Sequence, residues 1–161
     1  AVAQCDAAVV AMGPGIVGTG TRYGFSGIEQ GWMADAMNRM GGRPLIVPRL
    51  SRLDPRLRHQ VVSHHTLTVL RDVCCTPVTC VLASDMEPGF AEEARRRLAD
   101  ASGCSGHCLA YAPGSKGLER AVAGGLELST MGRGPDEEPE FFLTCAAAGD
   151  YARTMVMSEK S

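Results

Sequence analysis

The sequence predicts a single α/β domain with an open, mostly parallel sheet of four or five strands and helices on both faces, a three-layer, Rossmann-like arrangement. Three observations support this prediction. The chain has 161 residues and is 45% hydrophobic, which suits one domain with a single core. Short continuous apolar runs, typical of strands buried on both faces, alternate with helical patterns. Right-handed crossovers between such elements produce a parallel sheet.

The first third of the chain predicts a strand, a helix and a second strand. The apolar run at residues 7–12 indicates a buried strand. A capping box formed by Ser26 and Glu29 predicts a helix that continues to Met40, where two glycines follow. The next buried strand is expected at residues 45–47. Apolar spacing along the helix predicts a buried face composed of Ile28, Trp32, Met33, Ala36 and Met40.

The rest of the chain repeats this alternation. Asp54 followed by Pro55 predicts the start of a helix that reaches about Cys74, with a break near Ser63. The elements expected after it are a strand at 78–83, a helix at 90–101, a strand at 107–111, a helix at 115–123, a fifth strand at 126–130 and a final helix from residue 136.

Composition excludes several classes of protein. A formal net charge of −2 and a pI near 6.1 exclude a generally basic, histone-like binder of nucleic acid. The sequence has no apolar run near the roughly 18 residues that a membrane span needs, so no membrane partner is expected. Seven cysteines cannot all pair, which favours a reducing, cytoplasmic setting. The chain starts without Met or signal peptide and soon enters a predicted strand, so we expect a fragment lacking an N-terminal region.

A glycine-rich segment follows the first predicted strand. Residues 13–18 formally match the dinucleotide fingerprint G-x-G-x-x-G. The helix starts too late for that fingerprint, at Ser26, and the second strand ends in Arg49 rather than an acidic residue. A nicotinamide site and a tight packing turn both remain open, but we favour a loop that binds an anion through its N–H groups. Its candidate ligand-binding residues are Gly13, Gly15, Gly18, Thr19, Gly20, Thr21 and Ser26.

A basic segment follows the second predicted strand. Between Arg39 and Arg71 the chain has seven arginines and one acidic residue, Asp54. Guanidinium groups in a loop can hold phosphate or carboxylate in bidentate fashion. The candidate ligand-binding residues of this segment are Arg49, Ser51, Arg52 and Arg58.

Three of the four histidines lie within this region, and His59, His64 and His65 are the candidate catalytic residues. Imidazole titrates near neutral pH and can act as a general acid or base. Adjacent histidines on a helix point in different directions, so at most one of His64 and His65 is expected to face a given site. A buried, hydrogen-bonded histidine is the alternative. No H-E-x-x-H or paired C-x-x-C motif occurs, so no metal site is predicted, and the cofactor is left undetermined.

The polar segments share a position in the predicted fold, because each follows a strand. They are residues 13–24, 49–54, 84–87, 113–116 and 131–134. Ligands of open parallel sheets bind outside the carboxyl ends of the strands. We therefore expect the glycine-rich segment and the basic segment to lie side by side, where one anion can touch both.

These residues support a function hypothesis and an alternative to it. The first is an α/β protein that binds a small anionic molecule, with His64 or His59 as proton carrier if a transfer or hydrolysis occurs; whether it is an enzyme stays open. The alternative is a non-catalytic regulatory or protein-interaction module that meets its own N-terminal domain or forms a homo-oligomer. Nucleic acid is a weak third hypothesis, because aromatic residues near the arginines are limited to Tyr23 and Phe25.

Several stretches of the chain also resemble a bacterial family of unknown function, number thirty-eight sixty-six, in its C-terminal part. They are residues 12–21, 24–31, 48–51, 54–56, 58–59, 63–68, 131–133 and 141–142. The resemblance spans nearly the whole chain. It implies a bacterial cytoplasmic setting and a further N-terminal region, and it implies no activity.

Overall fold

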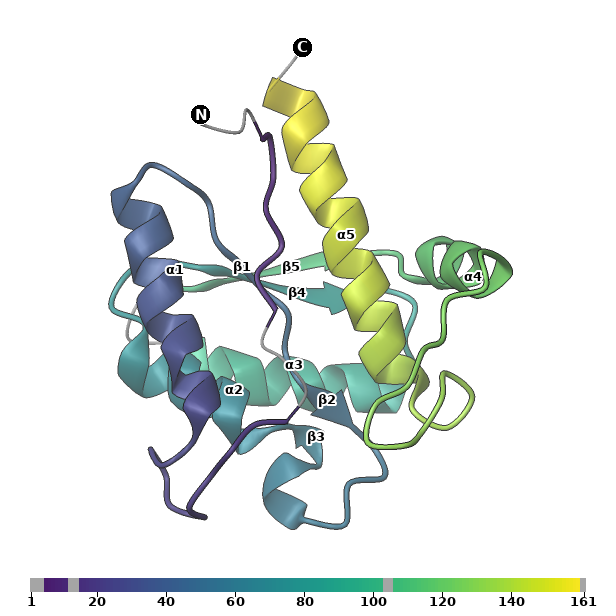
Figure 1. Ribbon diagram of the computed structural model, residues 1–161, viewed down its shortest axis with the longest axis horizontal. Helices are drawn as coiled ribbons and strands as arrows, with labels where there is room; N and C mark the ends of the chain where they lie inside the picture. Colours follow the sequence, from purple (N-terminus) through teal and green to yellow (C-terminus); the bar gives the residue numbers. More distant parts are fainter. Residues whose placement is uncertain (1–4, 12–14, 103–105, 160–161) are drawn as a thin grey trace.

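Figure 1 shows the computed structural model, which describes residues 5–11, 15–102 and 106–159. Within this part of the chain, three strands form a parallel sheet in the order β1-β4-β5. β1 is Leu45–Ile46, β4 is Thr79–Ala83 and β5 is Cys108–Ala112. β4 is the central strand, and its residues 80–83 are buried, as expected for a strand covered on both faces. A second, antiparallel pair consists of β2, Leu50–Ser51, and β3, Val61–Val62.

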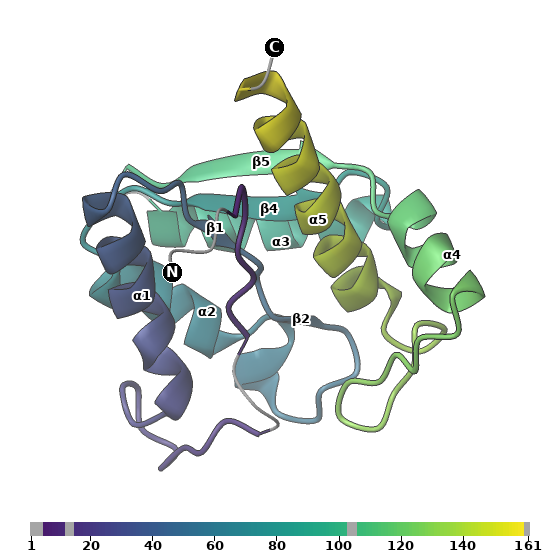
Figure 2. The ribbon, with the colours of Figure 1, turned by 45° about the horizontal axis from the view of Figure 1, so that its top comes forward.

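Five α-helices accompany these strands in the described residues. α1 is Glu29–Arg39, α2 is His64–Thr68, α3 is Pro88–Ser102, α4 is Ser115–Ala123 and α5 is Pro139–Glu159. Short turns extend two of them: η1, Ser26–Ile28, precedes α1, and the π-type turn η3, Val69–Val73, continues α2. In Figure 2, α5 crosses in front of the sheet and α3 lies behind it. The mixed α/β class is therefore confirmed. No helix in the described ranges is both long and apolar enough to span a bilayer.

Two predicted strands are wrong. Residues 7–11 form no strand, and Val9 is 95% exposed; residue 12 lies outside the described residues. Residues 126–130 form no strand either, because positive φ angles at Gly125, Met131 and Gly132 repeatedly turn the chain around them. The parallel sheet consequently has three strands in the described part of the chain, and the expected four or five are not confirmed.

The predicted helix from Asp54 is wrong over its first half. Asp54 accepts a hydrogen bond from the backbone N–H of Arg56, as a helix cap would, but only a short 3-10 turn follows, η2, Leu57–His59. The chain turns back within residues 52–60 so that β3 pairs with β2, and Val61 in β3 has a φ of 61°, which is rare for a β-branched residue and costs about 1–3 kcal/mol. The helix begins instead after Ser63, whose hydroxyl accepts from the backbone N–H of His65.

The first helix occupies the expected residues, but its buried face differs from the prediction. Gly31 and Ala34 are buried, whereas Trp32 is 60% and Met40 73% exposed. Gly31 decides this orientation, because a Cβ there would lie 2.5 Å from Cγ1 of Val73. Met33 and Ala36 are exposed as well, and Ile28 is only partly buried. Glycine thus lets α1 approach η3 closely, and the larger side chains turn outward.

Candidate functional site

The three candidate catalytic histidines form one cluster. His59 ends η2, and His64 and His65 open α2, so only residues 60–63 separate the two elements. The ring centroid of His59 lies 4.8 Å from that of His64 and 4.9 Å from that of His65. The rings of His64 and His65 are 4.3 Å apart. Both rings lie near His59, but they line different hollows: His64 lines one with Arg58 and Arg71, and His65 lines another with Arg49 and Thr66.

Ser63 positions the buried member of the cluster. Its Oγ lies 2.7 Å from Nδ1 of His59 and also accepts from the backbone N–H of His65, 3.2 Å away. Burial lowers the pKa of His59 to about 4, and the nearby Arg56 guanidinium adds to this effect. Burial likewise lowers the pKa of His65 to about 4 and lowers that of His64. At neutral pH, all three imidazoles are therefore uncharged.

The glycine-rich segment lies against this cluster, as expected. Phe25 at its end is buried and stacks on His65, with ring centroids 4.0 Å apart and planes 10° from parallel. Phe25 also forms an antiparallel bridge with Gly18, which holds the segment in place. Nη1 of Arg58 donates to the carbonyl of Gly20 at 3.4 Å. The predicted juxtaposition of the glycine-rich and basic segments is thus present.

A surface hollow of about 340 Å³ lies where these two segments meet. We call it the arginine hollow. It is lined by Gly20, Thr21, Arg22, Arg58, His64, Leu67, Thr68 and Arg71. Arg22 is paired with Asp72 through two hydrogen-bonding nitrogens. In contrast, neither Arg58 nor Arg71 pairs with a carboxylate among the described residues, so the hollow carries uncompensated positive charge.

Most of the glycine-rich segment supports its own turn. The backbone N–H of Thr19 donates to the carbonyl of Gly24 at 2.7 Å, and the hydroxyls of Thr19 and Thr21 lie 3.0 Å apart. A Cβ at Gly24 would meet the Thr19 hydroxyl at 2.0 Å, so only glycine fits there. Among the predicted ligand-binding residues of this segment, Gly20 and Thr21 line the arginine hollow.

The other predicted residues of the glycine-rich segment do not line the arginine hollow. Ser26 Oγ accepts from the backbone N–H of Val17 at 3.2 Å and therefore closes the turn. Gly18 pairs with Phe25, and Gly15 is exposed with a φ of 92°. Gly13 lies outside the described residues.

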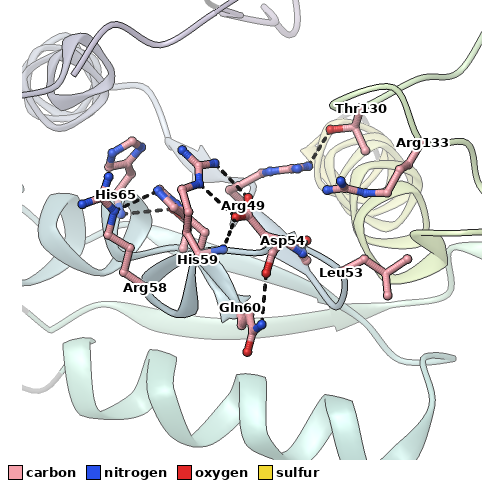
Figure 3. A network of polar contacts seen from close by, with 12 residues as sticks. Arg49, Leu53, Asp54, Arg58, His59, Gln60, His65, Thr130 and Arg133 are labelled. Atoms are coloured by element: carbon pink, nitrogen blue, oxygen red, sulfur yellow. Dashed lines mark hydrogen bonds and ion pairs between the residues drawn. The ribbon is translucent and has the colours of Figure 1, made fainter. Parts of the chain in front are cut away.

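The arginines of the basic segment separate into two directions, as Figure 3 shows. Arg58 lies with His59 and His65, whereas Arg49 reaches away from them to Thr130. The Arg49 guanidinium donates to Oγ1 of Thr130 at 2.7 Å and lies 4.4 Å from the ring centre of Phe141. Arg49 is therefore not placed to bind an anion in the arginine hollow.

Arg52 and Ser51 form hydrogen bonds with carboxylates at the N-terminal end of α5. The Arg52 guanidinium bonds Glu140, which is 3% exposed, and also reaches Glu87. Ser51 donates to Glu138 at 2.6 Å, and Glu138 is fully buried. Burial opposes ionisation of Glu138, but hydrogen bonds from Ser51 and from the Arg52 backbone keep its pKa below its ordinary value. These contacts give Ser51 and Arg52 a structural role.

The loops at the carboxyl ends of β4 and β5 meet, but their carboxylates are already hydrogen-bonded to backbone N–H groups of these loops and of the helices that follow. The Asp85 carboxylate accepts from the backbone N–H groups of Gly114 and Ser115, where α4 begins. Glu87 accepts from the backbone N–H groups of Gly89 and Phe90, at the start of α3. Both carboxylates therefore stabilise helix N-termini.

Sequence reasoning missed Arg22, Thr68 and Arg71 of the arginine hollow. One signal could have found the last two: His64, Leu67, Thr68 and Arg71 follow the i, i+3, i+4, i+7 spacing of one helical face. The sequence predicts a helix that begins at Asp54, whereas the helix begins after Ser63, so the helical face that carries His64 and Arg71 was not recognised. Ser63 was expected to be a break in that helix, whereas it is its cap.

The histidine cluster is also the group of described residues that could hold a metal ion. One nitrogen from each of His59, His64 and His65 lies within 4.8 Å of the others. The described cysteines are free thiols; burial raises the pKa of Cys80 to about 12 and that of Cys74 to about 11, which makes both thiols inert at neutral pH.

Comparison with known proteins places the chain in one family. Neither the curated proteins nor the solved structures provide a match to it. Family models do: the one described as "Protein of unknown function (DUF3866)" matches residues 1–149 of the 161, the same family that the sequence motifs resemble. The chain belongs to this family.

Proposed function

We propose that this protein binds a small phosphorylated or carboxylated molecule in the arginine hollow. The observation that carries the proposal is the pair of exposed guanidinium groups, Arg58 and Arg71, which line the same hollow as His64 without a carboxylate partner among the described residues. Guanidinium groups bind phosphate and carboxylate in bidentate fashion. Uncompensated arginines around a concave surface favour an anion there over a cation.

The glycine-rich wall of the hollow adds hydrogen-bond donors. The backbone N–H groups of Gly20 and Thr21 have no acceptor within the described ranges, so both can donate to a bound oxyanion. Gly20 has a φ of 80°, a conformation that glycine adopts freely. The hydroxyl-bearing Thr21 and Thr68 line the same space. Together these groups supply the neutral donors that accompany guanidinium in anion sites.

His64 is the histidine that a bound anion can reach, because it lines the hollow while His59 is buried. Its lowered pKa keeps the ring neutral at neutral pH, so it would accept a proton rather than donate one. That role suits a transfer or hydrolysis reaction. The proposal therefore keeps both reaction classes, with His64 as the proton carrier.

Isothermal titration calorimetry in the presence of EDTA tests this function. Pyrophosphate and citrate serve as the phosphate and carboxylate probes. We expect the protein to bind at least one of them, and the Arg58→Ala/Arg71→Ala variant to bind it at least tenfold more weakly, because a hydrogen bond to a charged group is worth about 1.5–3 kcal/mol. Arg120→Ala, which removes an exposed guanidinium from α4, is the matched control and should bind as the unchanged protein does.

Two results would contradict the function. One is the absence of binding to either probe. The other is equal affinity of the double variant and the Arg120→Ala control, which would show that the arginine hollow is not the binding site.

The finer points of fold and setting belong to the same proposal. We also propose a Rossmann-like, three-layer arrangement, which is supported by the parallel strand order β1-β4-β5 and by the packing of α3 and α5 against β4. A bacterial cytoplasmic setting is what the resemblance of the sequence motifs implies, and the free thiols of the described cysteines fit a reducing compartment.

A second candidate is the interaction module, and the outer face of α1 supports it. Trp32 and Met40 are exposed there, and Figure 1 shows residues 5–11, which include the exposed Val9 and Val10, running between α1 and α5. Exposed apolar side chains gathered in one region are typical of protein interfaces. Concentration-dependent self-association in analytical ultracentrifugation, without binding of either anionic probe, would favour this candidate over the anion site.

A further inference from the structure

Three imidazoles, of which His64 lines the arginine hollow, lie close enough together to hold a metal ion. Their nitrogens lie within 4.8 Å of one another, on residues His59, His64 and His65. A tetrahedral zinc ion with bonds of about 2.0–2.1 Å places its ligand nitrogens roughly 3.3 Å apart. The nitrogens must therefore approach by at most about 1.5 Å, which requires the half-buried His64 and His65 rings to rotate and the stacking of His65 on Phe25 to shift.

Two hydrogen bonds set the tautomer of His59 and leave one ring nitrogen with a lone pair. Nε of Arg58 points at Nε2 of His59 at 3.4 Å, and arginine can only donate, so Nε2 carries the lone pair. The ring proton is then on Nδ1 and is donated to Ser63 Oγ, 2.7 Å away. Metal-ligating histidines are commonly oriented by a partner on the other ring nitrogen in this way. Arg58 is exposed and can move aside to release Nε2.

The charges around the rings determine what kind of ion fits. Histidine binds a metal as the neutral imidazole, so three histidine ligands leave the charge of the ion uncompensated. Arg56 and Arg58 add positive charge, which opposes a bare cation, and Asp54 offsets part of it through its two hydrogen bonds to Arg56. A cation with three neutral protein ligands and an anion in the fourth position meets both conditions.

We propose that His59, His64 and His65 bind one Zn²⁺ ion, and that the fourth coordination position opens onto the arginine hollow. In the metal-bound protein His64 is a ligand, so its role as proton carrier applies only to the metal-free protein. The part of this proposal that concerns the fourth ligand rests on the proposed anion-binding function; the three-histidine site does not. Three protein ligands with one open position are typical of catalytic rather than structural zinc sites. The spacing of these histidines in the sequence does not reveal the site, because residues 61–63 form β3 and the cap of α2 instead of continuing a helix.

The test uses Co²⁺ as a spectroscopic substitute for Zn²⁺ in the untagged chain of 161 residues, stripped with EDTA and exchanged into chelator-free buffer. We expect one Co²⁺ per chain, with the visible bands of tetrahedral nitrogen coordination, and displacement by Zn²⁺. His64→Gln and His65→Gln should abolish the bands. Ser63→Ala should weaken Co²⁺ binding by about 10–100-fold, because it removes the group that orients His59. Thermal melting in EDTA checks that each variant is folded, and Arg120→Ala is the control with unchanged bands.

Each outcome decides a different part of the proposal. The absence of tetrahedral bands, bands that survive His64→Gln and His65→Gln, or thiolate-to-cobalt charge transfer would overturn the metal site. Pyrophosphate binding in EDTA without a cobalt site would leave the proposed function standing. A cobalt site without anion binding would support the three-histidine metal site and contradict the proposed anion-binding function. Added pyrophosphate should change the cobalt spectrum, and an unchanged spectrum would refute the open fourth position.

Discussion

At the scale of single residues, the arginines of the basic segment differ in what they contact. Arg52 neutralises a buried carboxylate, that of Glu140, and Arg49 rests on an aromatic ring, that of Phe141, so both serve the fold. Among the described residues, Arg58 donates hydrogen bonds only to the carbonyl of Gly20 and to Nε2 of His59. Its charge is therefore available to a bound anion. Function therefore depends on the direction of each side chain, and the local density of arginines does not reveal it.

The histidine cluster leads to a prediction about pH. In the folded protein, burial lowers the pKa of His59 from 6.5 to about 4, with help from Arg56, while Asp54 opposes it. The unfolded chain then takes up a proton near pH 6.5 and the folded chain does not. Stability should be fully present above pH 6.5 and should fall between pH 6.5 and 4, by roughly 3 kcal/mol for His59 alone.

Urea unfolding at a series of pH values measures this loss. His65→Gln removes one imidazole whose pKa is also about 4 and should give a shallower decline. The Asp54 carboxylate, whose hydrogen bond from Arg56 holds its pKa at about 2, contributes its own loss only below its ordinary value of 3.8. A free energy of unfolding that stays flat from pH 7 to pH 4 would refute the neutral cluster.

At the scale of elements, Gly31 sets how α1 packs, and this leads to a second prediction. Gly31→Ala should destabilise the protein by about 1–3 kcal/mol, because the new Cβ would overlap Val73 on η3. Gly149→Ala is the matched control in α5, where a Cβ meets nothing within 4 Å, and it should stabilise by up to about 1 kcal/mol. Thermal unfolding compares the two; equal effects would show that α1 does not pack closely on η3.

The elements also show what could be predicted from the sequence. The strands at 45–47 and 78–83 and the helices at 90–101 and 115–123 follow from apolar runs and caps, and their positions are confirmed within a few residues. The face of α1 could not be predicted, because contact at Gly31 outweighs the burial of larger side chains. The hairpin of β2 and β3 was missed because its strands have two residues each, too short for alternation to show.

At the scale of the whole molecule, the structure brings the glycine-rich segment and the histidines together and directs Arg49 and Arg52 elsewhere. The glycine-rich segment does meet the histidines, through the stacking of Phe25 on His65 and the contact of Arg58 with Gly20. The loops after β4 and β5 were expected to join it, but Asp85 and Glu87 bind helix N-termini instead. The sequence shows which loops are polar, and three-dimensional contacts decide which polar groups remain available.

The central claim is that the glycine-rich segment, two arginines and a histidine form one anion site. A titration of ¹⁵N-labelled protein with pyrophosphate in EDTA, followed by amide chemical shifts, tests it most directly. The account predicts that the largest shift changes occur at Gly20, Thr21, Arg58, His64 and Arg71, around the arginine hollow. Changes centred on residues 84–87 and 113–116, or no changes at saturating pyrophosphate, would contradict it.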